Sequence, residues 1–122
     1  MAVKANMNDD TTVSIRQQDD LIIATVQVSE LTTDIADSLQ AVGQSPHVKL
    51  ILDVAKVKFI NSVALGSLVV LLRRVKQNKG RLALVGLGGH CRNVMEVTGL
   101  HRVFELHDTL ESAVRTMNEP LS

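Results

Sequence analysis

Hydrophobic and polar residues alternate near the start of the chain, which is the pattern of a half-buried β-strand. The alternation begins at Val13 and Ile15 and resumes over residues 22–29, after the polar stretch at residues 17–20. A short polar stretch between two alternating segments is typical of a turn. The pattern therefore predicts an opening β-hairpin.

Two later segments, residues 48–54 and 82–85, are dense in aliphatic residues and too short to be helices. Such runs are typical of strands that are buried on both faces of a sheet, so we predict two central strands there. A further short strand is expected at residues 103–106.

Apolar residues at helical spacing predict four helices after the hairpin. The first has an apolar face of Ile35, Leu39 and Val42. Either Thr32 or Thr33 can be its N-cap, because a threonine hydroxyl accepts a hydrogen bond from the unpaired N–H groups of the first turn.

The second predicted helix is long, with Asn61 or Ser62 as its N-cap and Gly80 as its end. A third helix is expected over residues 92–97. Asp108 opens the fourth through a variant of the capping box, in which an aspartate replaces the usual serine or threonine.

Strands separated by helices favour parallel pairing through right-handed crossovers. The predicted fold is therefore a single α/β domain, with a mixed β-sheet, an antiparallel hairpin at one side and flanking α-helices. This domain is expected over residues 13–117. Residues 1–12 are expected to be a flexible N-terminal tail, and residues 118–122 a short C-terminal tail.

Composition narrows the function classes. The 122 residues include 13 basic and 13 acidic side chains, and there are two Phe but no Trp or Tyr, which argues against a nucleic-acid stacking platform. No apolar run is long enough for a membrane span, and no signal peptide is evident, so we expect a cytoplasmic protein without membrane insertion. The single cysteine excludes an internal disulfide, and no cofactor or metal is expected.

Residues 73–81 carry five basic side chains and no acidic one.

Several candidate reaction centres fit poorly. Asp53 ends a predicted strand like a phosphoacceptor aspartate, but the paired acids that would hold magnesium are missing. Residues 86–89 (Gly-Leu-Gly-Gly) lack the third glycine of a dinucleotide loop and are better interpreted as a tight turn. His90 and Cys91 are adjacent, so on a helix they point about 100° apart and meet poorly the contact that a base and its nucleophile need. Cys91 is then a small apolar filler.

Ser62 lies where the long helix is predicted to begin. Unpaired N–H groups and the helix dipole favour negative charge there, so a phosphoryl group on this hydroxyl would be tolerated by the fold. The small residues Ala64 and Gly66 would let another chain approach closely. Judged by its spacing alone, Ser62 is better interpreted as an ordinary capping residue, which is the commoner role.

Residues 59–66 read Phe-Ile-Asn-Ser-Val-Ala-Leu-Gly and follow an aliphatic strand that ends in Leu52-Asp53. The pattern Phe-Ile-Asp-Ser-x-Gly-Leu-Gly after such a strand is that of the STAS domain. Over about residues 13–117 the chain resembles this family, specifically the stand-alone anti-sigma factor antagonists. The chain departs from the pattern at Asn61, where the family has an acid, and at Ala64, where it has glycine.

The resemblance implies a regulatory protein in transcription signalling, not an enzyme. In that family the unmodified antagonist binds an anti-sigma factor, commonly a serine kinase, and phosphorylation breaks the contact until a phosphatase restores it. The phosphoacceptor of the family matches Ser62. The expected partner-binding residues surround it: Asp53, Lys56, Lys58, Asn61, Val63, Leu65, Gly66 and Ser67.

Two alternatives remain open. One is a constitutive STAS adaptor, without phosphorylation, in a transporter or lipid-trafficking complex. The other is an enzyme or small-molecule binder that uses the loop from Gly86 to His90 together with Cys91.

Overall fold

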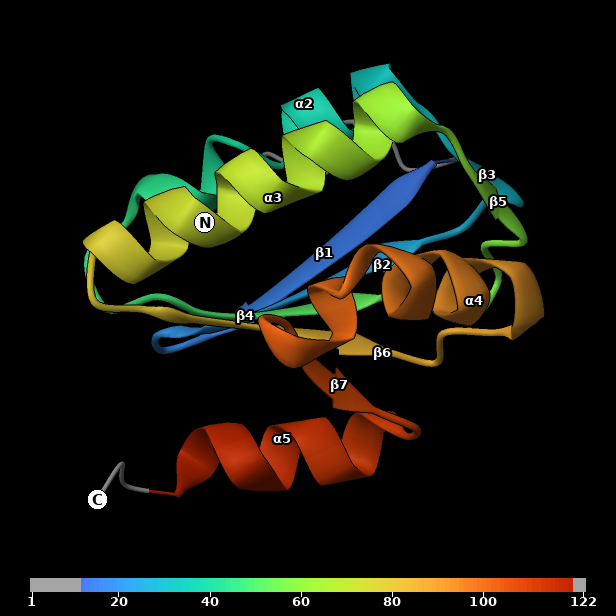
Figure 1. Cartoon of the computed structure of the whole chain (residues 1–122). Coiled ribbons are helices and arrows are strands. Elements are labelled where there is room, and N and C mark those ends of the chain that lie inside the picture. Colours follow the sequence, from blue (N-terminus) through green and yellow to red (C-terminus); the bar gives the residue numbers. More distant parts are fainter. Residues whose placement is uncertain (1–11, 120–122) are drawn as a thin grey trace.

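The computed structural model describes residues 12–119. They form a five-stranded sheet, a separate two-stranded sheet and helices on both faces of the larger sheet (Figure 1). In chain order the elements are β1 (Val13–Gln18), β2 (Leu21–Val26), β3 (Glu30–Leu31), α2 (Thr33–Ser38), η2 (Val42–Gln44), β4 (Lys49–Asp53), β5 (Phe59–Ile60), α3 (Ser62–Gln77), β6 (Arg81–Val85), α4 (Gly89–Thr98), η3 (Leu100–Arg102), β7 (Glu105–His107) and α5 (Leu110–Asn118).

The predicted hairpin is present. Strands β1 and β2 pair antiparallel, with Val13 opposite Val26 and Gln18 opposite Leu21. The two-residue turn between them places Asp19 in the left-handed region at φ 57°. Aspartate tolerates this conformation better than most residues, which suits a tight hairpin turn.

The large sheet has the order β1-β2-β4-β6-β7, and every pairing after the hairpin is parallel. The predicted mixed α/β sheet is therefore confirmed. The central strand β4 is covered on both faces, because Leu50, Ile51 and Leu52 are all fully buried. That burial explains why its sequence is continuously aliphatic, without polar alternation.

The two faces of the sheet support two separate cores. Leu50 and Leu52 point into the larger core, beneath α2, α3 and α4. Ile51, between them, points to the opposite face, where α5 contributes Ala113 and Met117 (Figure 1). The candidate site described below lies at the ends of the helices over the larger core.

Helix α3 is amphipathic. Ala64, Leu68, Leu71 and Val75 recur at spacings of three and four and are buried against the sheet. The helix ends shortly before Gly80, whose backbone passes so close to the Val48 carbonyl that a Cβ atom would overlap it. Glycine is therefore required there by close approach of two backbones.

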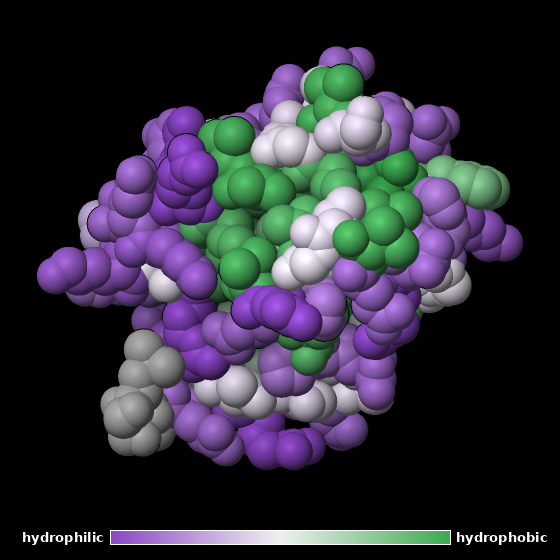
Figure 2. Space-filling view, viewed as in Figure 1, coloured by the Kyte–Doolittle hydropathy of each residue, from purple (hydrophilic) through white to green (hydrophobic). Residues whose placement is uncertain are grey.

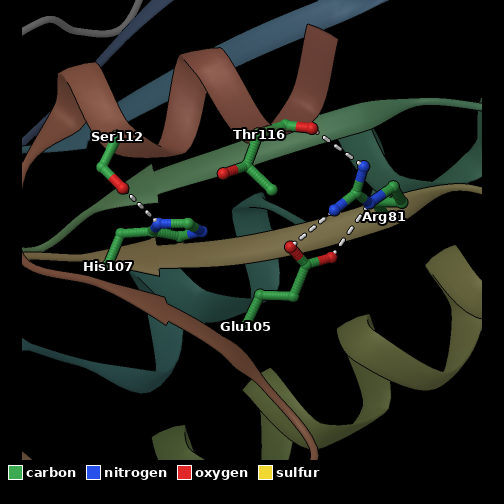
Figure 3. Close-up of polar contacts among 5 residues, drawn as sticks. All are labelled: Arg81, Glu105, His107, Ser112 and Thr116. Atoms are coloured by element: carbon green, nitrogen blue, oxygen red, sulfur yellow. Dashed lines mark hydrogen bonds and ion pairs between the residues drawn. The ribbon is translucent and has the colours of Figure 1, made fainter. Parts of the chain in front are cut away.

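Helix α5 is tied to the sheet by polar contacts (Figure 3). The Arg81 guanidinium donates two hydrogen bonds to the Glu105 carboxylate, at 3.0 and 2.8 Å, and a third to the Thr116 carbonyl at 3.2 Å. A second contact joins His107 Nδ1 and Ser112 Oγ at 2.9 Å. The bidentate pair with Glu105 holds the Arg81 side chain in one orientation. Its hydrogen bond to the Thr116 carbonyl and the contact between His107 and Ser112 then fix α5 on the face of the sheet away from α3.

The first helix departs from the expected pattern. Helix α2 ends at Ser38, and Val42 lies in the 3-10 turn η2 instead of on the same helical face. Leu39 is the C-cap and is buried, while Ile35 carries the apolar face. Val42 nevertheless fits the helical spacing of apolar residues, because η2 packs on the same core as α2.

The last third of the chain differs from prediction at element ends. Helix α4 begins at Gly89, before Arg92, and strand β7 occupies Glu105–His107 instead of residues 103–106. The N-cap of α5 is Thr109, whose hydroxyl accepts from the Ser112 N–H, and not Asp108. Residues 1–11 and 120–122, which cover most of the expected tails, lie outside the described residues.

Candidate functional site

The site is built where β4 leaves the sheet and the chain turns toward α3. Asp53 ends β4, and its Oδ1 accepts a hydrogen bond from the Ala55 N–H at 3.0 Å, which shapes the first turn of the loop. Val54 and Val57 are buried and anchor the loop in the core. The Ser29 carbonyl then accepts from the N–H groups of the next two residues, 58 and 59, at 2.7 and 3.1 Å. The loop is therefore fixed at both ends.

Of the two N-cap candidates for α3, Asn61 and Ser62, the structure uses Asn61. Its Oδ1 accepts a hydrogen bond from the Ala64 N–H at 2.7 Å, and its backbone is extended. Ser62 is consequently the first residue of the helix and is exposed to solvent. Since Asn61 performs the capping, the Ser62 hydroxyl takes part in none of the side-chain hydrogen bonds found among residues 12–119.

The surroundings of Ser62 favour negative charge. The first turn of α3 contains no acidic residue, so nothing there neutralises the positive end of the helix dipole. Lys56 and Lys58 are exposed in the loop that leads to β5. Asn61 is neutral, whereas an aspartate at this position would repel an anion on the neighbouring hydroxyl.

An aromatic contact beside the site was not predicted from the sequence. The Phe59 ring is 58 % exposed, and its centroid lies 5.8 Å from that of His90 in the first turn of α4. This contact joins residues 31 positions apart in the chain. Phe59 lies in the two-residue strand β5, which is too short to show a periodic pattern. The sequence around it therefore does not indicate the contact with His90.

The other predicted partner-binding residues divide into two groups. Val63, which is 63 % exposed, and Gly66, which has open space around it, lie on the surface of α3. Ser67 and Leu65 are half-buried and also serve packing: the Ser67 hydroxyl donates to Asp37 of α2 at 3.0 Å, and Leu65 lines a small apolar cavity.

That cavity lies directly below the start of α3 and has a volume of about 20 Å³, enough for one water-sized group. Its lining is entirely apolar and includes Cys91 and Met95 of α4. Burial raises the pKa of the Cys91 thiol above its ordinary value of 9.0, and the thiol faces the Val57 carbonyl at 3.9 Å. A buried, protonated thiol is a poor nucleophile, which agrees with Cys91 as an apolar filler.

The remaining candidates contribute little chemistry. Gly86 has φ +82° and lies close to Ala55, so the glycine-rich segment is a tight turn between β6 and α4. Within residues 12–119, no three His, Cys, Asp or Glu side chains are grouped in a way that could hold a metal ion. Over the same range, no helix combines the length and apolarity needed to cross a bilayer.

Residues 5–113 match the sequence model of the family described as STAS domain. The candidate anti-sigma factor antagonist BtrV of Bordetella bronchiseptica is 26 % identical over 73 residues, which cover 60 % of this chain and 63 % of that relative. The match thus spans less than two thirds of the length of that protein.

Two solved structures share the fold. The Bacillus cell fate determinant SpoIIAA in its phosphorylated form has a TM-score of 0.67 at 17 % identity, covering 86 % of this chain and 98 % of the other. The murine anion transporter Slc26a9 has a TM-score of 0.68 at 16 % identity, covering 84 % of this chain but 18 % of the transporter. At such identities the likeness concerns the fold alone.

Proposed function

The chain belongs to the STAS domain family, and we propose that it is an anti-sigma factor antagonist whose binding to an anti-sigma factor is switched by phosphorylation of Ser62. In the unmodified state the partner would pack on the start of α3 and the preceding loop. In the modified state the phosphoryl group would prevent that contact. The proposal assigns no catalytic step to this chain itself.

The observation that carries the proposal is the free hydroxyl of Ser62. Asn61 satisfies the helix end through its contact with Ala64, so within the described residues 12–119 the Ser62 hydroxyl has no side-chain hydrogen bond to lose on modification. An exposed serine at a helix start usually caps that start, and here it does not. The capping interpretation, which the sequence left open, is therefore weakened for Ser62 and belongs to Asn61.

The transfer would be carried out by the partner, a serine kinase. The Ser62 oxygen attacks the terminal phosphorus of ATP, the hydroxyl proton is lost to the kinase or to water, and ADP leaves. A phosphatase would reverse the modification by adding water to the phosphoserine and releasing inorganic phosphate. Neither step requires a cofactor or a metal bound by this chain.

Phosphorylation would change the interface without unfolding the domain. It adds about −2 charge and three acceptor oxygens at the helix start. The free N–H groups of the first turn can balance that charge within the chain, and Lys56 and Lys58 are exposed in the loop that precedes β5. A partner packed on Val63 and Gly66 would meet both the added bulk and the added charge, so its contact would be lost.

The residues around Ser62 would have distinct parts in binding. Val63 and Gly66 offer an apolar and closely approachable surface, while Lys56 and Lys58 attract an acidic partner surface. Asp53 and Asn61 would hold the loop and the helix start in shape.

The proposal can be tested by affinity purification from the cells that make the protein. Four baits are compared: the unmodified chain, Ser62→Ala, Ser62→Asp and Ser45→Asp. The last is a matched control, because Ser45 is an exposed serine outside the site. We expect an anti-sigma factor to be retained by the unmodified chain, by Ser62→Ala and by Ser45→Asp, and lost only with Ser62→Asp. Equal retention by all four baits would contradict the switch.

A constitutive adaptor is the second candidate. Two observations favour it: the fold is shared with the STAS domain of a transporter, and Asn61 replaces the acid that the family pattern has before the serine. This alternative predicts that Ser62→Asp retains the same partner as the unmodified chain, and that this partner is a transporter or trafficking subunit.

A further inference from the structure

Helix α3 has two flanks beside its buried face, and only one of them is covered by α2. On the covered flank, the Ser67 hydroxyl donates to Asp37 of α2 at 3.0 Å. Successive residues of a helix turn by about 100°, so Leu65 and Val69 lie on the other flank, about 160° from Ser67. Both are half-buried, and Leu65 lines the small cavity that α4 completes. The uncovered flank therefore faces α4.

Helix α4 presents an apolar flank in return. Its residue His90 contacts Phe59, immediately before α3, whereas Arg92 on the other flank is ion-paired with the loop before α5 at 3.1 Å. Val94 and Val97 lie within about 40° of His90 around the helix, so they share the flank that faces α3. Val97 is 78 % exposed, and neither valine belongs to the packed groups on either face of the sheet.

Together these flanks form an apolar groove, which we call the α3/α4 groove. By helical geometry Leu65 and Val69 line its α3 side, and Val94 and Val97 line its α4 side. Between the two helices lies the small hollow lined by Leu65 and by Cys91 and Met95 of α4. Figure 2 shows hydrophobic side chains gathered over the region between these two helices, with hydrophilic side chains around them. Exposed apolar surface of this kind, with a polar rim, marks an interaction site.

The groove is positively charged at one end. Arg73 and Lys76 are exposed and continue the flank of Val69 toward the end of α3. Helix α3 contains no acidic residue, and the single acid of α4, Glu96, lies on the flank of Arg92, away from the groove. Neither Arg73 nor Lys76 forms an ion pair with another residue of the described range 12–119.

We propose that the α3/α4 groove binds an amphipathic α-helix of a partner protein, with acidic residues at the end that meets Arg73 and Lys76. Both walls are helices and offer no free backbone edge, so a bound strand would leave its own N–H and C=O groups unpaired, whereas a helix satisfies them internally. From Ser62 to Lys76 the groove runs about 20 Å, which matches about four helical turns. The charge at its end sets the direction of the bound helix.

The inference rests on the groove and not on modification of Ser62. The probes are two fluorescent 18-residue helical peptides that share the same leucines at helical spacing, with glutamate at the polar positions of one and lysine in the other. Binding to the full chain is measured by fluorescence anisotropy at low salt. We expect the glutamate peptide to bind at least tenfold more tightly than the lysine peptide.

Variants locate the binding. Val97→Asp is expected to lower the affinity for the glutamate peptide at least fivefold. Val70→Asp changes an exposed valine on the other flank of α3 and should leave that affinity unchanged. The double variant Arg73→Glu, Lys76→Glu is expected to reverse the preference in favour of the lysine peptide. Circular dichroism checks that each variant is folded.

Two results would overturn the proposal. One is equal affinity of the two peptides, or no binding of either, for the unmodified chain. The other is a change of oligomeric state in Val97→Asp, measured by analytical ultracentrifugation, without any peptide binding, which would show a second copy of the chain in the groove. Binding of the peptides is expected whether or not Ser62 can be phosphorylated, so failure here and failure of the switch are separate outcomes.

Discussion

Asn61 and Ala64 are joined by a hydrogen bond of 2.7 Å from the Ala64 N–H to the Asn61 side-chain oxygen, and this bond leaves Ser62 without a capping role. The two functions that a serine could combine at a helix start are here divided between neighbouring residues. Asn61 stabilises the fold, and Ser62 is available for modification. The division makes the contribution of each residue measurable by substitution.

Replacing the cap should lower stability. Asn61→Ala removes the acceptor for the Ala64 N–H, and we expect the free energy of unfolding to fall by about 1 kcal/mol. Asn61→Asp keeps an acceptor and adds a favourable charge at the helix start, so its free energy of unfolding should equal or exceed that of the unmodified chain. Urea denaturation followed by circular dichroism measures the free energy of unfolding of both variants. An equal loss of stability in the two would contradict the capping role of the Asn61 side chain.

A negative charge at Ser62 should not damage the fold. Because the first turn of α3 has no acid, Ser62→Asp places the only side-chain charge there that complements the helix dipole. We expect the free energy of unfolding to rise by about 0.5 kcal/mol at low salt, with the gain shrinking as salt is added. The same denaturation experiment at two salt concentrations tests this. A clear loss of stability would mean that any lost binding reflects damage to the domain.

Gly66 should be dispensable for folding. It lies within α3, and a Cβ atom there would meet no neighbouring atom within 4 Å. Gly66→Ala is therefore expected to raise the free energy of unfolding by about 1 kcal/mol, since alanine is the better helix former. Gly66→Leu should also fold, but it should weaken partner retention in the affinity experiment, because the leucine side chain would project from the surface that we propose for binding. Unchanged retention would place the interface elsewhere.

The Cys91 thiol should make stability depend on pH only under alkaline conditions. Burial raises its pKa above 9.0 in the folded state, so the folded chain holds the thiol proton more tightly than the unfolded chain. This contribution is complete below pH 9 and is lost as pH rises through the folded pKa. We expect Cys91→Ala to be less stable than the unmodified chain at pH 7, by about 1–2 kcal/mol for the apolar volume removed, with the difference narrowing above pH 9.

Local chemistry explains which parts of the site could be predicted. The helix start at Asn61 and Ser62 depends on hydrogen bonds between residues three apart, and the buried strand β4 depends on its own aliphatic run. The contact between Phe59 and His90 depends on how two βα units pack together. The pairing of Glu30 with Phe59 in the small sheet likewise joins two-residue strands that carry no periodic signal.

The sequence also could not decide between adjacent residues that suit the same role. Asp108 and Thr109 are both good N-caps, and the structure uses Thr109, whose hydroxyl accepts from the Ser112 N–H. The same serine contacts the ring of His107 at the end of β7, a contact that the sequence does not indicate. Likewise, Leu65 was expected among the partner-binding residues, and only the packing against α4 shows that it is half-buried.

The central claim is that Ser62 is modified in the cell. Intact-mass and peptide mass spectrometry on the protein isolated from its own cells, across growth and stress conditions and with phosphatase treatment as the control, tests it most directly. We predict a phosphatase-sensitive phosphoryl group on Ser62 in at least one condition. An unmodified Ser62 in every condition, or phosphorylation confined to other residues, would contradict it.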